Sequence, residues 1–398
     1  MRTRSFHCIG LVIILLVLTG CWNRRELNEI SIATAIGIDK NGDQFIVSVQ
    51  LLNPDEIAAK KGGGQSLPVI TQQIASGGTI FESIRQLSTI TPRKIYSSHL
   101  RILVIGEELA RSGIAEVLDV LSRDPELRTD FYIIVARDAK ASEVLEILTP
   151  LEKIPSNKLF SSLKDSEQNW GVTAKMDLHQ LIYDLVDKGR EPAMASIRIV
   201  GNKNKGQSKE NLNAVKPPTN LQYEGAAVFH GDKLVGWLSS NESKGFNYTQ
   251  GNIKSTVVRV TCPDGGNLGV EVIRTHHKIK GKIENGRPVI DAEVGIEGNI
   301  GEVACRFDMT NNSILELEKQ VSKEVKDDVE HAIKKAKSYK ADIFGFGGAI
   351  HRANYKVWHQ FEDRWDEEFV DLEIRVKVDT KIRRTGSVLE SFLKKLEE

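Results

Sequence analysis

The first 21 residues constrain the fold most, because they determine on which side of a membrane the rest of the chain folds. Two arginines precede the ten residues from Ile9 to Leu18, which are apolar apart from one glycine. This run is too short to span a hydrocarbon core of about 30 Å, so it predicts a secretory signal peptide. It ends in Leu-Thr-Gly-Cys, the order of a bacterial lipoprotein signal, which predicts cleavage after Gly20 and a diacylglyceryl group on Cys21.

A lipid on Cys21 would hold the body of the protein at the external surface of a membrane. Burying an acyl chain contributes about 0.8 kcal/mol per CH₂ group, so two chains give lasting attachment where one gives marginal binding. No other stretch approaches 18 consecutive apolar residues, and the best, Phe131–Ala136, has the length and β-branching of a buried strand. An ordinary secretory signal followed by a chance cysteine is the alternative.

The composition indicates an ordinary folded protein and excludes several other classes. Of the 398 residues, 40% are hydrophobic and 27% are charged, which disfavours disorder and fibrous repeats. At roughly 150 residues per domain, the length predicts two or three domains. The 54 basic and 54 acidic residues give a net charge of +0, so the chain lacks the basic surface expected of a nucleic-acid-binding protein.

Cysteine usage leaves one pairing to consider. Cys8 belongs to the predicted signal peptide and Cys21 to the predicted lipid anchor, so Cys262 and Cys305 remain. Their separation is unlike that of a Cys-x-x-Cys zinc or redox site. A location outside the cytoplasm permits a disulfide between them, and two buried free thiols are the alternative.

After a tether at residues 21–30, the pattern predicts a mixed α/β region over residues 31–200. Residues 31–38 and 44–52 have the composition of strands, and Asn41-Gly42 between them is a hairpin signal. Further apolar patterns predict strands at 100–105, 130–136 and 193–200, with helices between them. The alternation is too irregular for a doubly wound sheet, and a division into two subdomains near residue 150 is left open.

A polar segment rich in glycine, asparagine and lysine, residues 201–218, ends in a proline pair and predicts a linker. We expect a C-terminal α+β domain at 219–385 and a tail or helix at 386–398. Apolar and charged residues alternate at 290–297 and 370–379, which is typical of antiparallel strands with one face in water. Ser313-x-x-Glu316 predicts the capping box of a long helix. The predicted fold class is α+β, with a C-terminal antiparallel sheet covered by a long helix.

The sequence contains no arrangement of residues that indicates catalysis, a metal site or a cofactor. His276 and His277 are adjacent on a predicted strand, so their side chains point to opposite faces and do not share a metal. His351 and His359 are eight residues apart, unlike zinc ligands one helical turn apart. No Gly-x-Ser-x-Gly elbow and no Gly-x-Gly-x-x-Gly turn between a strand and a helix occurs. We therefore expect a non-enzymatic protein.

Several segments, in order along the chain, match the motifs of one known protein family. Residues 21–27, Cys-Trp-Asn-Arg-Arg-Glu-Leu, match the usual start of that family except at Asn23, where the family has aspartate. Glu242–Gly245 resembles its Glu-Thr-Arg-Gly step but has Lys244 in place of the arginine. Further similar segments are His99–Glu107, Arg123–Arg128, Gly225–Phe229, Lys233–Trp237, Asp342–Gly347, His351, Trp358 and Trp365.

These segments resemble the Ger(x)C family of spore germination lipoproteins. This resemblance implies a lipid-anchored, non-enzymatic C subunit of a nutrient germinant receptor, needed for nutrient-triggered spore germination. It also implies a position on the outer face of the spore inner membrane. The implied partners are polytopic membrane A and B subunits, together with membrane lipid through Cys21, and no cofactor or nucleic acid. A solute-binding lipoprotein of a transporter is the alternative, although such proteins usually have regular βα repeats around a hinge.

Charged residues after the anchor and aromatic residues near the C-terminus are candidate partner-binding residues. The set is Arg24, Arg25, Glu26, Arg123, Arg128, Phe344, Phe346 and Trp358. For the first three a solvated tether is the alternative, and for the next two an internal ion pair or a helix-terminus role. For the three aromatic residues the alternative is an ordinary position in the hydrophobic core.

Overall fold

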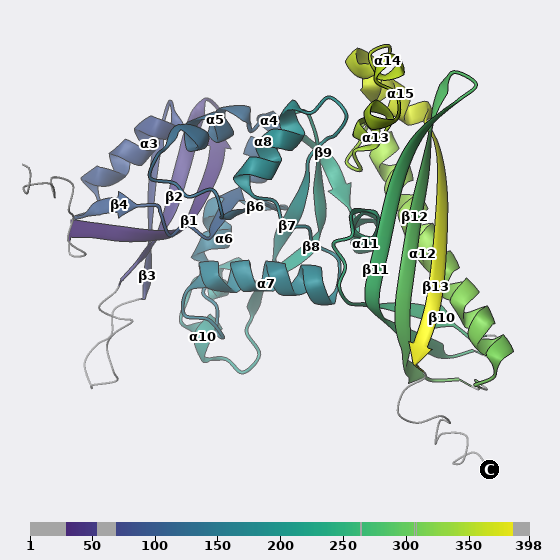
Figure 1. The fold of residues 1–398 in the computed structure, drawn as a ribbon. Helices are drawn as coiled ribbons and strands as arrows, with labels where there is room; N and C mark the ends of the chain where they lie inside the picture. The colour runs from purple at the N-terminus through teal and green to yellow at the C-terminus, as the bar shows by residue number, and fades with distance from the viewer. Residues whose placement is uncertain (1–28, 54–68, 263–264, 306, 308, 385–398) are drawn as a thin grey trace, which may run out of the picture.

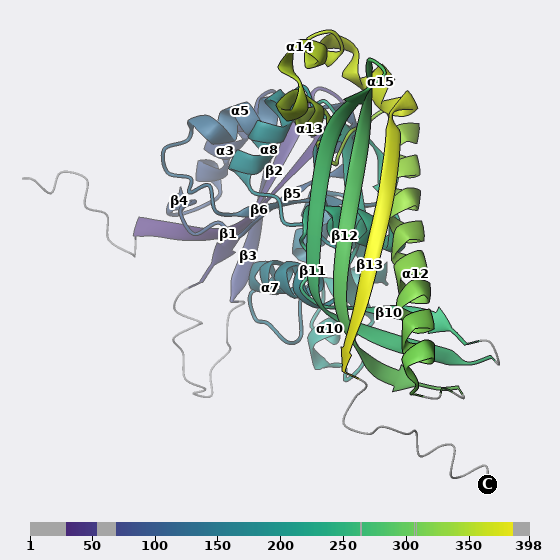
Figure 2. The ribbon, with the colours of Figure 1, turned by 45° about the vertical axis from the view of Figure 1, so that its right-hand side comes forward.

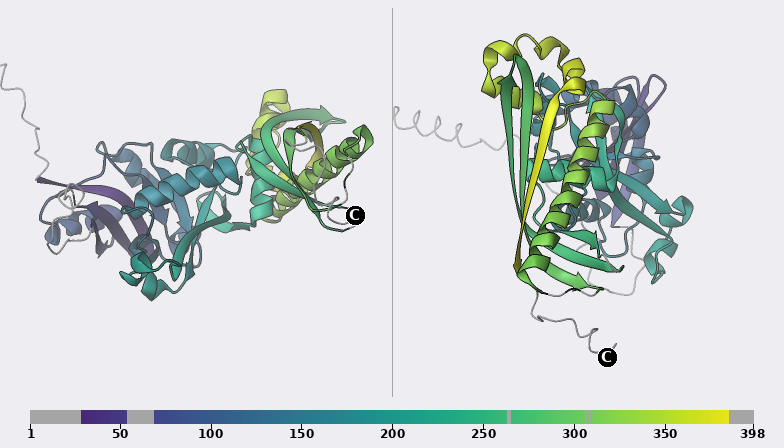
Figure 3. Two further views of the ribbon diagram at one scale, coloured as in Figure 1. Left: turned by 90° about the horizontal axis from the view of Figure 1, so that it is seen from below. Right: turned by 90° about the vertical axis from the view of Figure 1, so that its right-hand side faces the viewer.

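The computed structural model describes residues 29–53, 69–262, 265–305, 307 and 309–384. Within them the chain forms a nine-stranded sheet and a four-stranded sheet, which lie next to each other along an elongated molecule (Figures 1 and 3). We call residues 29–238 the first unit and residues 239–384 the second unit. The predicted signal peptide, the lipidation sequence with Arg24, Arg25 and Glu26, and the predicted tail lie outside the described residues. The predicted α+β fold class is confirmed.

The first sheet mixes parallel and antiparallel strands in the order β3-β2-β1-β5-β6-β7-β8-β9, with β4 beside β1. β1 and β2 form the predicted hairpin, in which Asn41 pairs with Gln44 and Gly42 takes a left-handed φ of 58° at the turn. The strands are β1 (Ile30–Asn41), β2 (Gln44–Leu52), β3 (Ile70–Gly77), β4 (Lys94–Tyr96), β5 (Ile102–Ile105), β6 (Tyr132–Ala136), β7 (Ala193–Gly201), β8 (Thr219–His230) and β9 (Lys233–Leu238).

Helices cover both faces of the first sheet. Leu109, Val117 and Leu181 from α4, α5 and α8 enter one core, and Leu145 and Leu163 from α6 and α7 enter a second core on the opposite face. Since α6 and α7 lie on either side of residue 150 and share one core, the sheet is not divided into two subdomains there. The helices are α3 (Ile80–Gln86), η2 (Leu87–Thr89), α4 (Glu107–Ser112), α5 (Ala115–Arg123), α6 (Ala141–Glu146), α7 (Pro155–Asn169) and α8 (Leu178–Val186).

The polar segment 201–218, predicted as a linker between two domains, connects two neighbouring strands of the first sheet. It contains the short helices α9 (Lys203–Gly206) and α10 (Glu210–Asn213). β8 then returns antiparallel to β7, with Thr219 opposite Gly201, and β9 follows β8. The second unit therefore starts at residue 239 and not at residue 219. A polar composition indicates an exposed segment, but it does not show to which sheet the next strand returns.

The second sheet has the strand order β10-β11-β12-β13. β10, β11 and β12 are antiparallel as predicted, whereas β13 runs parallel to β12, with Ile290 opposite Ile374. The expectation of a wholly antiparallel sheet is wrong because the chain returns along the sheet through a helix before β13 begins. The strands are β10 (Thr256–Thr261), β11 (Asn267–Glu284), β12 (Arg287–Val303) and β13 (Glu373–Arg384).

The returning helix, α12 (Asn311–Ser338), lies along the second sheet (Figure 2). Leu317, Val321 and Val325 recur every four residues and are buried in the core beneath the sheet. The helix begins before the predicted capping box, because the hydroxyl of Thr310 accepts a hydrogen bond from Ser313 N at 3.2 Å and so makes Thr310 the N-cap.

Shorter helices complete the second unit and join it to the first. α11 (Ser240–Gln250) lies between the units, and α13 (Phe346–Ala353), α14 (Tyr355–Trp358), η3 (Glu362–Arg364) and α15 (Trp365–Asp371) gather at the upper end of the second sheet in Figure 1. α11 approaches α12 closely at Gly245, where a Cβ atom would stand 2.1 Å from the carbonyl oxygen of Asp328. Only glycine permits that contact.

A disulfide joins Cys262 to Cys305, with their Cα atoms 6.4 Å apart. Cys262 follows β10 and Cys305 follows β12, so the bond closes a loop that contains the β11–β12 hairpin. Of the two alternatives that the sequence left open, the structure has the bonded pair.

Replacing both cysteines by alanine should lower the free energy of unfolding by about 2–4 kcal/mol, because the unfolded chain regains the freedom that the closed loop removes. Urea unfolding of the full chain, followed by circular dichroism, measures the change. Reduction of the wild-type chain should give a similar decrease. An unfolding midpoint that neither treatment moves would show that the bond contributes nothing.

Candidate functional site

Asp342, in the loop between α12 and α13, is buried where the two units meet. Its carboxylate accepts hydrogen bonds from the amides of Phe344 at 3.2 Å, Gly345 at 3.0 Å and Gly347 at 2.8 Å, and from the indole N–H of Trp365 at 2.9 Å. Burial raises the pKa of Asp342 to about 6, although the hydrogen bonds act in the opposite direction. The carboxylate thus caps α13 and fixes the loop before it.

The loop 187–191, between α8 and β7, joins the first unit to this site through its backbone. Glu191 N donates to the carbonyl oxygen of Asp342 at 2.9 Å. At Gly189 a Cβ atom would stand 2.6 Å from Gly348 N and 2.8 Å from the carbonyl carbon of Gly347, so only glycine fits. Direct backbone contact therefore sets the distance between the units.

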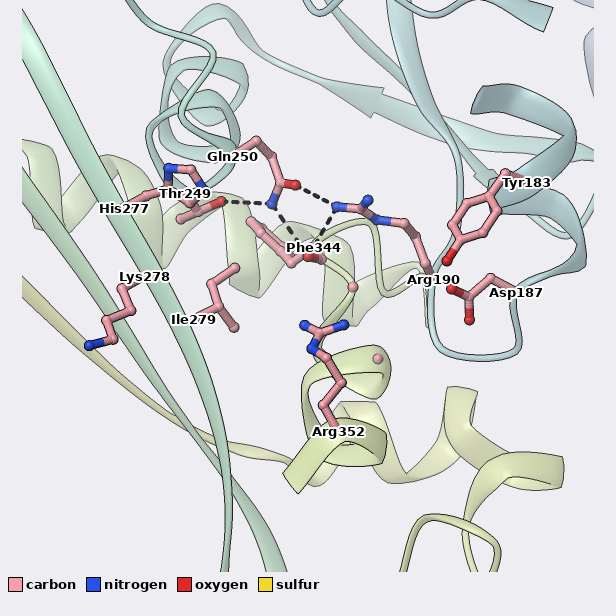
Figure 4. Close-up of a pocket in the computed structure, with 12 residues that line it drawn as sticks. Tyr183, Asp187, Arg190, Thr249, Gln250, His277, Lys278, Ile279, Phe344 and Arg352 are labelled. Carbon is pink, nitrogen blue, oxygen red and sulfur yellow. Dashed lines mark hydrogen bonds between the residues drawn. The ribbon is translucent and has the colours of Figure 1, made fainter. Parts of the chain in front are cut away.

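A cleft of about 350 Å³ opens beside this contact, lined from α8, α11, β11 and α13 (Figure 4). The guanidinium of Arg190 donates to Gln250 Oε1 at 2.5 Å and to the carbonyl oxygen of Phe344 at 3.4 Å, and it lies 4.0 Å from Asp184 Oδ1. Burial raises the pKa of Asp184, and the nearby arginine opposes that increase. The charge of Arg190 is therefore used within the protein, where it connects both units.

The rest of this cleft is lined by groups of both charges. The side chain of Arg352 points into it and has no hydrogen bond or ion pair with any other described residue, whereas Lys278 points away from the other labelled side chains (Figure 4). Tyr183 and Asp187 line the opposite side. Such a mixed lining can accept small polar molecules, but it does not select one chemical class.

A second cleft, of about 340 Å³, is lined by several carboxylates beside the 187–191 loop. Glu191 Oε1 lies 3.3 Å from His230 Nδ1, and His230 Nε2 lies 3.9 Å from Asp366 Oδ2. Burial raises the pKa of Glu191, and the nearby charges of Asp342 and Asp366 raise it further. The part of the chain that the structure describes contains no cluster of three or more residues that could hold a metal ion.

α11 provides a further connection between the units, on the other side of the first cleft. Lys244 is buried with its ammonium group 3.5 Å from the centre of the Trp170 ring, and burial lowers its pKa. Burial also raises the pKa of nearby Asp328 on α12 to about 6. Asn247 donates to the carbonyl oxygen of Gly171 at 2.8 Å. Lys244, which stands where the similar Glu-Thr-Arg-Gly segment has arginine, therefore lies in this junction.

The two arginines predicted as partner-binding residues lie on the surface of the first unit. Arg123, on α5, pairs with Asp119 one helical turn earlier at 2.9 Å, and Arg128 pairs with Asp130 at 3.0 Å. Both guanidinium groups are mostly exposed. These are local surface ion pairs, and the structure does not bring them together with the predicted aromatic residues of the second unit.

Phe344, Phe346 and Trp358 have exposed fractions of 2%, 0% and 3%, so they lie in the hydrophobic core, which was the alternative to a partner-binding surface. Phe344 stacks on Phe346 with ring centres 5.0 Å apart, and Trp358 meets Trp365 edge-on at 5.2 Å. These rings fill the space around the loop that Asp342 organises, because burying large aromatic surfaces is favourable there. Their contribution is to build the junction.

Sequence reasoning missed Asp342 and Arg190 as the residues that hold the units together. An acid shortly before a glycine-rich turn and a helix start is the pattern of a helix cap, and that signal could have identified Asp342. No local pattern marks Arg190, because Gln250 and Phe344 follow it by 60 and 154 residues.

The substitution Asp342→Asn should lower the free energy of unfolding at pH 7 by about 2–4 kcal/mol, because an amide has one acceptor oxygen and leaves buried N–H donors unpaired. The substitution should also change how the free energy of unfolding depends on pH. With its pKa raised in the folded state, Asp342 holds a proton that the unfolded chain has lost, so wild-type stability falls as pH rises from about 4 through about 6. Urea unfolding at several pH values measures both effects.

Asp363→Asn is the matched control, since Asp363 is exposed, pairs with Lys188 at 2.8 Å and has its pKa lowered by that partner. This variant should leave the pH dependence of the free energy of unfolding between pH 4 and 6 nearly unchanged. If Asp342→Asn behaves like this control, the carboxylate does not organise the junction.

Comparison with known proteins gives the family. Two family descriptions match: "Spore germination protein N-terminal domain" over residues 23–199 and "Spore germination B3/ GerAC like, C-terminal" over residues 224–386. Spore germination protein KC of Bacillus subtilis (strain 168) is 35% identical over 395 residues, covering 95% of this chain and 96% of that protein. Spore germination protein B3 of the same strain is 26% identical, covering 98% of this chain and 100% of that protein.

The fold also matches a solved structure. The crystal structure of the GerBC protein superimposes with a TM-score of 0.56 at 24% sequence identity, over 87% of this chain and 96% of that one. The gap between the two matched family regions falls at the segment that connects β7 to β8, although the first sheet continues across it. Since similarity to spore germination proteins extends over nearly the whole chain, the protein belongs to the Ger(x)C family of spore germination proteins.

Proposed function

We propose that this chain is the lipid-anchored, non-enzymatic C subunit of a nutrient germinant receptor, needed for nutrient-triggered spore germination. The observation that carries the proposal is the similarity to germination proteins over almost the full length of both chains. The junction around Asp342 is also what a structural subunit needs, because it holds two units in one arrangement. Its polar groups are used in packing and capping.

Attachment through Cys21 is the proposed means of membrane association. None of the helices that the structure describes is long and apolar enough to cross a membrane. The support for a lipid anchor is the Leu-Thr-Gly-Cys sequence after a short apolar run, with cleavage after Gly20. Two acyl chains on Cys21 would hold the chain on the outer face of the spore inner membrane.

The proposed protein partners are the polytopic A and B subunits of the receptor. Arg24, Arg25 and Glu26 follow the proposed anchor directly, so they would lie at the level of the lipid headgroups or of a membrane subunit. Arg123 and Arg128 offer exposed guanidinium groups on the first unit, where a carboxylate of a partner could exchange with their local pairs.

Cys21→Ala should remove lipid labelling and greatly weaken germination in response to nutrients, because the unanchored chain leaves the membrane surface. Spores of the parent strain carrying the wild-type chain, no chain or Cys21→Ala are triggered with nutrients and with a receptor-independent stimulus, and incorporation of labelled palmitate is followed in parallel. We expect the deletion and Cys21→Ala strains to lose germination in response to nutrients and to keep germination in response to the receptor-independent stimulus.

Cys8→Ala is the matched control, since Cys8 lies in the segment that cleavage would remove, and it should change neither labelling nor germination. A deletion strain that germinates normally on nutrients, with no related chain expressed, would overturn the receptor role. Palmitate incorporation that persists in Cys21→Ala would overturn the proposed anchor alone.

A further inference from the structure

The outer edge of β3 differs from the edges that β9, β10 and β13 form at the ends of the two described strand orders. Exposed strand edges are templates for pairing with other chains, and proteins usually cover them or place charges on them. β9 is covered by the second unit, because the hydroxyl of Tyr339 accepts from Trp237 N at 3.3 Å and donates to Trp237 O at 3.2 Å. β10 exposes Arg259, and β13 exposes seven charged side chains, Glu373, Arg375, Lys377, Asp379, Lys381, Arg383 and Arg384.

β3 has none of these protections. Its sequence, Ile-Thr-Gln-Gln-Ile-Ala-Ser-Gly over residues 70–77, contains no charge and no proline. It pairs with β2 in continuous register from Ile70 to Gly77, without a bulge that would twist the edge away. Ile74 exposes 42% of its surface. No other described strand pairs with its outer side.

The register shows which backbone groups of β3 are free. Asn53 N donates to Val69 O at 2.8 Å, so residues 69, 71 and 73 direct their backbone groups toward β2. Since these directions alternate in an antiparallel pair, Ile70, Gln72 and Ile74 direct their N–H and C=O groups outward. The Gln72 side chain donates to the carbonyl oxygen of Ser142 on α6 at 3.1 Å, and the pairing with β2 along all of β3 holds the edge in place.

The order of the outward residues is symmetrical about Gln72. If a second β3 lies antiparallel with Gln72 facing Gln72, then Ile70 of each copy faces Ile74 of the other, and Thr71 faces Gln73. Every outward N–H and C=O of the central residues then finds a partner, and apolar side chains lie opposite apolar side chains. We propose that β3 pairs with β3 of a second copy of this chain in this register, which joins two first sheets into one.

A lipid anchor would favour such pairing by concentrating copies on one surface. The backbone geometry itself does not depend on the anchor or on the receptor role. The test therefore uses the purified full chain and does not use germination as its readout.

Disulfide cross-linking of variants that each carry one added cysteine tests the register. Under mild oxidation Gln72→Cys should give a covalent dimer, because residue 72 faces itself across the two-fold axis. Thr71→Cys and Gln73→Cys should cross-link weakly alone and strongly when the two variants are mixed. The wild-type chain, which keeps Cys21, Cys262 and Cys305, measures the background.

A lysine at residue 74 should separate the copies. Ile74→Lys in the Gln72→Cys background places a charge opposite Ile70 of the second copy, and it should lower the cross-linked dimer by about tenfold or more, a loss of about 1.4 kcal/mol or more. Ile273→Lys is the matched control, because Ile273 exposes a similar 43% of its surface but lies on β11. Circular dichroism confirms that both lysine variants are folded.

Three outcomes would overturn the proposal. The first is a Gln72→Cys chain that forms no dimer above background, and the second is equal cross-linking of all three cysteine variants alone. The third is a dimer that Ile74→Lys and Ile273→Lys affect equally. If Gln72→Cys in spore membranes cross-links only to a different protein, the edge binds that protein and not a second copy.

Discussion

The structure depends on one buried carboxylate that is satisfied almost wholly by the backbone. Burying the side chain of Asp342 is costly, and the amides of the α13 turn and the indole of Trp365 offset that cost. These donors fix the loop, and the carbonyl oxygen of the same residue accepts from Glu191 of the first unit. A helix cap and the contact between the units therefore meet in one residue.

Glycines and buried polar side chains extend this contact over a wide surface. Gly189 lets the loop after α8 touch α13 of the other unit. Within the second unit, Gly245 lets α12 support α11, the helix that contacts the first unit through Lys244 and Asn247. Arg190 and Lys244 place their charges within the junction, where burial or a ring contact replaces water. The polar groups that look most like a functional site in this protein are thus largely used to hold two units together, which agrees with membership of a receptor subunit family.

Sequence patterns that involve neighbouring residues predicted the local structure well. The β1–β2 hairpin followed from Asn41-Gly42, and the long helix α12 from its apolar spacing, although the cap is Thr310 and not Ser313. Features that depend on distant parts of the chain could not be predicted. Alternation is the same in parallel and antiparallel strands, so the direction of β13 was missed, and a polar segment gave no sign that β8 returns beside β7.

The same limit applies to the site. Aromatic residues near the C-terminus fit either a surface for a partner or a core, and the structure places them in the core because the loop of Asp342 must be covered. The contacts of Arg190 join residues far apart in sequence, and single-sequence patterns carry no trace of such pairs.

Hydrogen exchange of the full chain, read by mass spectrometry, tests the central claim most directly. If Asp342 joins the two units, the segments 187–191 and 342–348 should exchange together and as slowly as the core strands β6 and β12, because both open only when the junction opens. Fast exchange in either segment, while the core strands of both units stay protected, would show that the units are held independently and that the carboxylate is not the connection.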